Sequence, residues 1–175
     1  MAEYEVPEPI MNSPYEKPAL HWLIKEGESP VQEEGRRRAG YFYRDPKAPA
    51  TGDEHEARGR WVDLALVNLV RERVEAWRPL ALKGEGGVTR STMELLNYWR
   101  REGRKFRLFF AQMEAVETII FLKEARADFL QGIDVPLDEP SDDQKKAREY
   151  SAFRRYACKM ATGTGKTTVM GMLAA

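Results

Sequence analysis

The pattern of hydrophobic and polar positions divides the chain into an irregular first third and a periodic remainder. Between residues 62 and 77, apolar side chains recur every three or four residues, at Leu66, Val70, Val74 and Trp77. This spacing predicts an amphipathic helix, because residues three and four apart share one helix face. Pro79 is expected to stop the helix, since proline lacks the N–H that a helix interior uses.

Two more helices follow in the pattern. Ser91 and Glu94 have the spacing of a capping box, which predicts the start of a second helix carrying Leu95, Leu96 and Trp99. A third helix is predicted over about residues 110–131, with one side lined by Met113, Val116, Ile120 and Leu122. The acidic stretch from Asp134 to Gln144 contains two prolines and predicts a loop.

Residues 1–60 hold seven of the ten prolines and little apolar periodicity. They are interpreted as an irregular arm and linker, with short anchored pieces at residues 19–24 and 41–43. The charge run at residues 53–56 is interpreted as a solvated part of this linker. A helical region is expected over 61–105, and a nucleotide-binding domain is expected to begin at 106 and continue through 175.

Near the C-terminal end, residues 156–160 are predicted to form a short strand that leads into a glycine-rich loop, with a helix opening at Lys166. Such a loop lets successive backbone N–H groups surround an anion. Lys166 would reach the β- and γ-phosphates of ATP, and the Thr167 hydroxyl would ligate Mg²⁺. The strict pattern has glycine where Met160 stands. The predicted phosphate-binding residues are Thr162, Gly163, Thr164, Gly165, Lys166, Thr167 and Thr168.

A second nucleotide-binding element is predicted at the start of the third helix. The Gln112 amide offers a donor and an acceptor in one plane, which can pair with the N6 and N7 edge of adenine. Phe109 or Phe106 could stack on the base. About fifty residues separate this element from the loop.

Composition adds limits to this picture. The 28 basic and 28 acidic side chains cancel, so net charge indicates no partner. No stretch approaches the ~20 apolar residues needed to cross a bilayer, and no membrane partner is expected. The first ten residues do not resemble a signal peptide, and the chain has one cysteine, Cys158. A cytoplasmic location is therefore expected. Cys158 is expected to be a small buried residue of the strand, and the four tryptophans are expected to pack in the N-terminal region.

The loop at residues 160–167 and the element around Gln112 resemble motif I and the upstream glutamine of superfamily-two (DEAD/DEAH-box) helicases. Several further segments resemble the Res subunit of type III restriction enzymes, namely residues 12–22, 35–38, 41–42, 67–74, 87–90 and 109–122. The resemblance implies an ATP-dependent DNA translocase with RecA-like domains, acting on double-stranded DNA with a methyltransferase subunit that reads the site. A nuclease domain would follow.

The expected fold class is therefore α/β: the start of a RecA-like P-loop NTPase domain, incomplete here, preceded by a mostly helical and irregular region. Because a Walker B acidic pair, an arginine finger and a nuclease cluster are missing, this chain is expected to bind ATP without hydrolysing it. A nucleotide kinase and a non-catalytic remnant are the alternatives. The cationic side chains at 100, 101, 104, 105 and 107 could touch DNA but are interpreted as a solvated helix end, and Arg36–Arg38 likewise.

Overall fold

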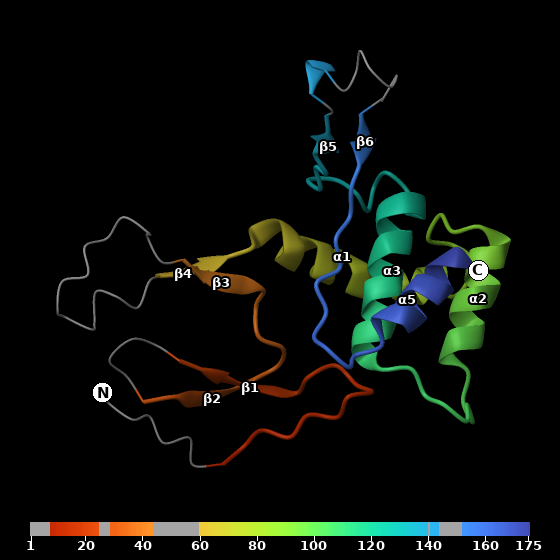
Figure 1. Cartoon of the computed structure of the whole chain (residues 1–175). Helices are drawn as coiled ribbons and strands as arrows, with labels where there is room; N and C mark the ends of the chain where they lie inside the picture. The colour runs from red at the N-terminus through yellow and green to blue at the C-terminus, as the bar shows by residue number, and fades with distance from the viewer. Residues whose placement is uncertain (1–7, 25–28, 44–59, 140, 144–151) are drawn as a thin grey trace. The chain divides into compact units, whose positions relative to one another are not determined.

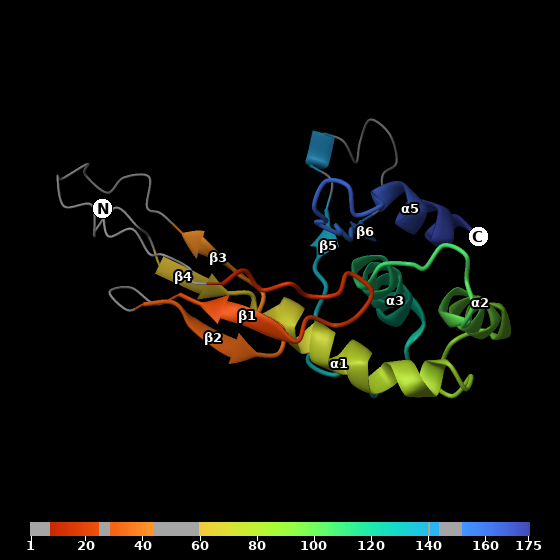
Figure 2. The ribbon, with the colours of Figure 1, turned by 90° about the horizontal axis from the view of Figure 1, so that it is seen from below.

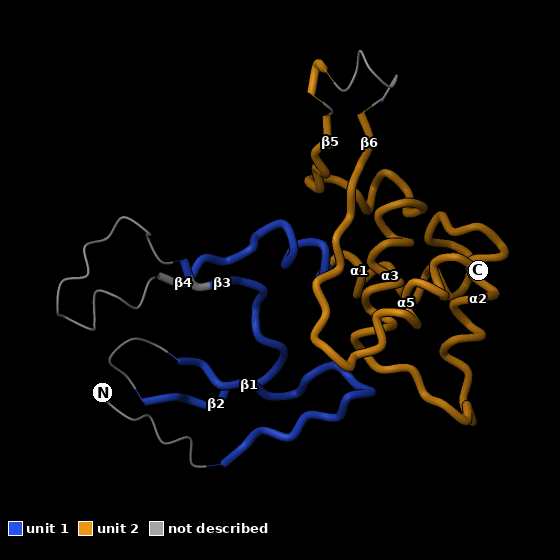
Figure 3. Tube along the Cα trace, viewed as in Figure 1, with its two compact units in different colours: residues 1–72 blue, residues 73–175 orange. Residues whose placement is uncertain are grey.

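The computed structural model describes residues 8–24, 29–43, 60–139, 141–143 and 152–175. They form two compact units, residues 1–72 and residues 73–175, and each is described by itself (Figure 3). Helices and three small antiparallel sheets are both present, which confirms a mixed α and β composition. The described part of the chain contains no parallel strand pair. The domain boundaries expected after residues 60 and 105 stay predictions.

The first unit contains two hairpins, which the sequence interpretation as an irregular arm missed. β1 (Leu20–Leu23) pairs with β2 (Val31–Glu34), and β3 (Gly40–Tyr43) pairs with β4 (Arg60–Asp63) (Figure 1). The expected anchored pieces at 19–24 and 41–43 thus lie in strands β1 and β3. Their partners β2 and β4 are only four residues long, and neither shows enough apolar and polar alternation to indicate a strand. The predicted charge run at 53–56 lies outside the described residues.

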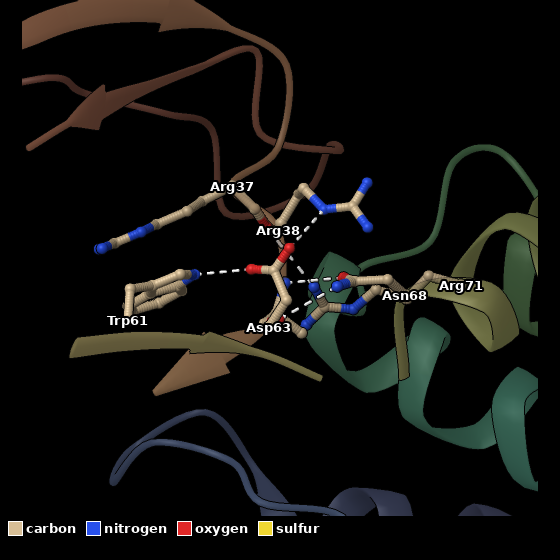
Figure 4. Close-up of polar contacts among 7 residues, drawn as sticks. Arg37, Arg38, Trp61, Asp63, Asn68 and Arg71 are labelled. Atoms are coloured by element: carbon tan, nitrogen blue, oxygen red, sulfur yellow. Dashed lines mark hydrogen bonds and ion pairs between the residues drawn. The ribbon is translucent and has the colours of Figure 1, made fainter. Parts of the chain in front are cut away.

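Asp63, the last residue of β4, organises the polar contacts of the second hairpin (Figure 4). Its carboxylate accepts hydrogen bonds from Arg38 Nε at 3.2 Å and from Trp61 Nε1 at 2.7 Å. The Arg37 guanidinium lies 4.5 Å from the centre of the Trp61 ring, a cation–π distance. Arg37 and Arg38 therefore have partners within the hairpin, and Trp61 is partly exposed instead of packed in a core.

Asn68 joins this hairpin to the helix that follows it. Its amide accepts a hydrogen bond from Ala39 N at 2.7 Å and donates one to Ala39 O at 3.1 Å (Figure 4). The side chain is buried, so these bonds satisfy groups that would otherwise be costly to remove from water. Arg71, one turn later, lies within 3.5 Å of the Arg37 carbonyl oxygen.

The first helix, α1 (Ala65–Ala81), begins later and ends later than predicted. It begins later because Arg60–Asp63 pair as β4. It continues through Pro79 although this residue has no N–H to donate, and Leu82 N still donates to Arg78 O at 3.1 Å beyond it. Trp77 and Ala81 are fully buried on its inner face. The Trp77 indole donates to Gly86 O at 2.9 Å, which holds the glycine-containing segment at residues 84–87 against the end of α1.

The second helix, α2 (Arg90–Arg100), is capped by Thr89 and not by Ser91 as predicted. The Thr89 hydroxyl accepts a hydrogen bond from Thr92 N at 3.2 Å, while Ser91 lies inside the first turn. Glu94 does not complete a capping box and instead binds Arg90 at 2.9 Å across one turn. The preference for Thr89 follows from its extended backbone, which the cap position requires.

The third helix, α3 (Phe110–Glu124), ends seven residues before the predicted end. Ala125 takes an extended backbone, and Arg126 N contacts Gly86 O at 3.4 Å, so the chain leaves the helix there. The Phe121 ring meets Trp77 edge-on, with ring centres 5.5 Å apart. The buried apolar core of the second unit consists of Val74, Trp77, Ala81, Leu96, Trp99, Met113, Val116, Phe121, Ala125, Val169 and Met172.

The end of the chain differs most from expectation. β6 (Phe153–Arg154) pairs antiparallel with β5 (Leu137–Asp138), while residues 155–160, which cover the predicted strand, have no ladder partner. An extended segment forms a strand only when another segment accepts and donates its backbone hydrogen bonds. Cys158 is exposed, which contradicts the expected buried position. The predicted helix opening at Lys166 is confirmed as α5 (Lys166–Ala174).

Candidate nucleotide-binding site

The loop before α5 has the backbone that its glycines permit. Gly163 and Gly165 both have φ near 80°, in the left-handed region that other residues adopt at a cost. Gly165 is the N-cap of α5, and the first helical hydrogen bond runs from Thr168 N to Gly165 O at 3.0 Å. The remaining N–H groups of this first turn have no partner within the helix. They make the turn suitable for binding an anion.

Lys166 lies across the mouth of this loop. Its ammonium nitrogen donates to Met160 O at 3.2 Å and to Ala161 O at 3.0 Å. Thr164 Oγ1 also donates to Ala161 O, at 2.7 Å. The lysine side chain is exposed, so its ammonium can move from these carbonyl oxygens to a phosphate without leaving a buried position.

Gln112 lies against the loop, although fifty residues separate them in the sequence. A Cβ atom added at Gly165 would overlap the Gln112 side-chain nitrogen, so the amide and the glycine are in direct contact. The buried Gln112 also binds its own helix start, since its Oε1 accepts from Phe109 N at 2.8 Å. Helices α3 and α5 lie side by side in both views (Figures 1 and 2). The two predicted nucleotide-binding elements are therefore adjacent.

The two candidate stacking residues have different surroundings. Phe109 is the N-cap residue of α3, half-buried and bonded through its backbone to Gln112. Phe106 lies in the connection between α2 and α3, and 75% of it is exposed. Of the two, Phe109 is the one tied directly to the residue that contacts the loop.

Glu117 holds α3 in place, and the sequence analysis did not identify it. Its buried carboxylate binds the Arg78 Nε at 2.6 Å and the Arg100 Nε at 2.7 Å, with a second contact to Arg100 Nη2. The three residues come from α1, α3 and α2, so one carboxylate ties three helices together. A signal was available, because Glu117 occupies a helical position between Met113 and Phe121 on the apolar side.

The predicted phosphate-binding residues lie together at the loop and the first turn of α5. Thr162, Gly163, Lys166, Thr167 and Thr168 are exposed, and Thr164 and Gly165 are half-buried. Among the described residues, no group of three or more His, Cys, Asp or Glu side chains is arranged to hold a metal.

Cys158, two residues before the loop, gives a prediction about reactivity. It is exposed, and partial desolvation raises the pKa of its thiol above the usual value. Since only the thiolate reacts, we expect Cys158 to react with a disulfide reagent more slowly than a free cysteine at pH 7.5. The rate should continue to rise at pH values where the free thiol has reached its plateau. Absorbance kinetics between pH 7 and 10 test this, and a midpoint at or below that of free cysteine contradicts it.

No protein-family model, curated protein or solved structure matches this chain. Within the described ranges, no helix combines the length and the apolar character needed to span a membrane.

Proposed function

We propose that this chain is the ATP-binding front part of a nucleic-acid translocase or helicase of the type III restriction kind, with the start of a RecA-like domain in its second unit. The observation that carries the proposal is the contact between Gln112 and Gly165. It brings a possible base-reading amide next to a phosphate-binding loop, as the ATP sites of superfamily-two helicases require. A nucleotide kinase has no need of this glutamine element.

Each residue has a distinct role in this proposal. Backbone N–H groups from Gly163 to Thr167 surround the phosphates, and Lys166 neutralises their charge. Thr167 ligates the Mg²⁺ that accompanies ATP. Oε1 of Gln112 accepts from Phe109 N, so its second lone pair and the Nε2 donor remain to pair with the adenine edge. Phe109 stacks on the base. Double-stranded DNA, a methyltransferase subunit and a cytoplasmic location belong to the proposal through the resemblance alone.

Nucleotide titration tests the proposal. We expect the 175-residue chain to bind ATP with Mg²⁺, and Lys166→Ala to weaken binding by roughly 30- to 160-fold, because a charge-assisted hydrogen bond contributes about 2–3 kcal/mol. Lys159→Ala is the matched control, since Lys159 is an exposed lysine that precedes the loop. Calorimetry or a fluorescent ATP analogue measures both. Equal affinities for the two variants would overturn the phosphate role of the loop.

The base-reading role is tested by the ratio of the ATP affinity to the GTP affinity. The parent chain should prefer ATP over GTP, and Gln112→Ala should bring the two affinities close together. Lys166→Ala should weaken both nucleotides equally. This ratio is insensitive to a general loss of folded protein, which matters because Gln112 also caps α3. A parent chain that binds ATP and GTP equally would leave the phosphate loop in place and remove Gln112 as the adenine reader.

A further inference from the structure

The end of α2 and the connection to α3 expose aromatic rings among cationic side chains. Phe106 is 75% exposed and Tyr98 is 54% exposed. Leaving a phenylalanine ring in water forgoes a stabilisation of about 2 kcal/mol that burial would give.

Each of the two rings has a cationic side chain within cation–π distance. The Arg101 guanidinium lies 3.8 Å from the centre of the Tyr98 ring, and that of Arg104 lies 5.7 Å from it. The Arg101 contact also lowers the pKa of the Tyr98 hydroxyl. On the second ring, Lys105 Nζ is 5.5 Å from the centre of Phe106. The connection thus presents alternating flat rings and positive charges.

Arg100 does not belong to this exposed surface. Arg100, which the sequence groups with the same basic cluster, is turned inward to the buried Glu117 carboxylate. Arg104 Nε donates to Phe106 O at 2.9 Å and so fixes the backbone on which the exposed ring stands. Glu102 is the one acidic residue between Tyr98 and Arg107, and the remaining charges there are positive. The surface is therefore strongly cationic with a fixed aromatic platform.

We propose that Tyr98, Arg101, Arg104, Lys105 and Phe106 form a contact site for single-stranded nucleic acid. Cations of this kind bind the phosphate backbone, and aromatic rings stack on unpaired bases without regard to sequence. Duplex DNA keeps its bases stacked inside and would leave both rings unused. The site rests on the proposed function and adds to its duplex DNA partner a contact with one separated strand. Phe106, the last residue of the site, lies three residues before Phe109 in the sequence.

Fluorescence anisotropy with a labelled 20-nucleotide oligo(dT) and a 20-base-pair duplex tests this site on the whole chain. We expect the single strand to bind more tightly than the duplex. Phe106→Ala and Tyr98→Ala should each weaken the single-strand complex roughly tenfold, as loss of one stacked base does. Lys105→Ala should lower the slope of log affinity against log salt by about 0.7, because one phosphate contact is lost.

Phe153→Ala is the matched control. Phe153 is also about half exposed, at 50%, and carries the Arg155 guanidinium 5.2 Å from its ring centre, but it lies in β6. Its replacement should leave oligo(dT) affinity unchanged. All three aromatic side chains are exposed, so the variants should keep the circular dichroism of the parent chain. Equal loss in Phe153→Ala and Phe106→Ala would overturn the assignment.

Two further outcomes would overturn the proposal, and a comparison of two variants distinguishes this site from the ATP site. Equal affinity for duplex and single strand, with no effect of the aromatic replacements, would reduce the site to non-specific phosphate contact. Absence of oligo(dT) binding would remove it altogether. Without nucleotide, Lys166→Ala should retain the parent affinity for oligo(dT), and Tyr98→Ala should retain the parent affinity for ATP. Failure of one site is thereby distinguished from failure of the other.

Discussion

Replacing Glu117 with alanine is expected to lower the free energy of unfolding of the second unit by about 3 kcal/mol. The change removes the one carboxylate that binds both Arg78 and Arg100 and leaves two partly buried guanidinium groups without it. The estimate is at the lower end for buried ion pairs, because Arg78 is 22% and Arg100 34% exposed and water solvates them in part. A loss of this size should lower the thermal midpoint by on the order of 15 °C.

Tryptophan fluorescence measures this unfolding, since Trp77 and Trp99 are buried in the same unit. The matched control is Glu94→Ala, which removes an exposed carboxylate bound to Arg90 at 2.9 Å across one helical turn. Such a pair contributes about 0.3–0.5 kcal/mol. A Glu117→Ala midpoint within a few degrees of the Glu94→Ala midpoint would contradict the role given to the three-helix contact.

Gly165→Ala is expected to destabilise the start of α5 by about 3 kcal/mol. Part of the loss, about 1–2 kcal/mol, comes from a positive φ that alanine adopts poorly. The rest comes from overlap with the Gln112 amide, which is buried and can move only by giving up its hydrogen bond from Phe109 N. Amide hydrogen exchange at Val169 and Met172, the buried residues of α5, should become faster.

Gly163→Ala separates the two parts of that loss. Gly163 has the same φ of 80°, but a Cβ atom there meets nothing within 4 Å. Its replacement should therefore cost only the backbone part, about 1–2 kcal/mol. The double variant Gly165→Ala with Gln112→Ala should lose less than the sum of its single variants, because removing the amide removes the overlap. Strict additivity would show that Gln112 and Gly165 do not touch.

The sequence was most informative where chemistry restricts the backbone. The glycine positions before Lys166 and the helix that follows were predicted from residue type alone, because left-handed conformations and a helix start have few solutions. The apolar and capping patterns predicted three helices. The start of α3 is as predicted, whereas both ends of α1, the cap of α2 and the end of α3 differ from the prediction. Local patterns set the presence of a helix, while its ends depend on tertiary contacts. Thr89 and the late end of α1 are examples.

Features that depend on distant partners were missed. The hairpin partners in β2 and β4 become strands only through pairing, and residues 155–160 remain unpaired despite a strand-like composition. In the sequence, nothing distinguishes Glu117 from the other acidic residues. Its role depends on Arg78 and Arg100, which come from other helices. The adjacency of Gln112 and Gly165 was an inference from two motifs, and the fold supplies the contact itself.

The position of Lys166 has a consequence for how fast and how tightly the loop takes up an anion. Its ammonium group already donates hydrogen bonds to two carbonyl oxygens. A phosphate that binds Lys166 would therefore replace these two bonds instead of adding to them. The net gain from the lysine is the difference between the two sets, which is smaller than the strength of the ion contact in isolation. In the phosphate binding that we propose, those bonds would open before the anion is fully bound, so binding would include a rearrangement step within the loop.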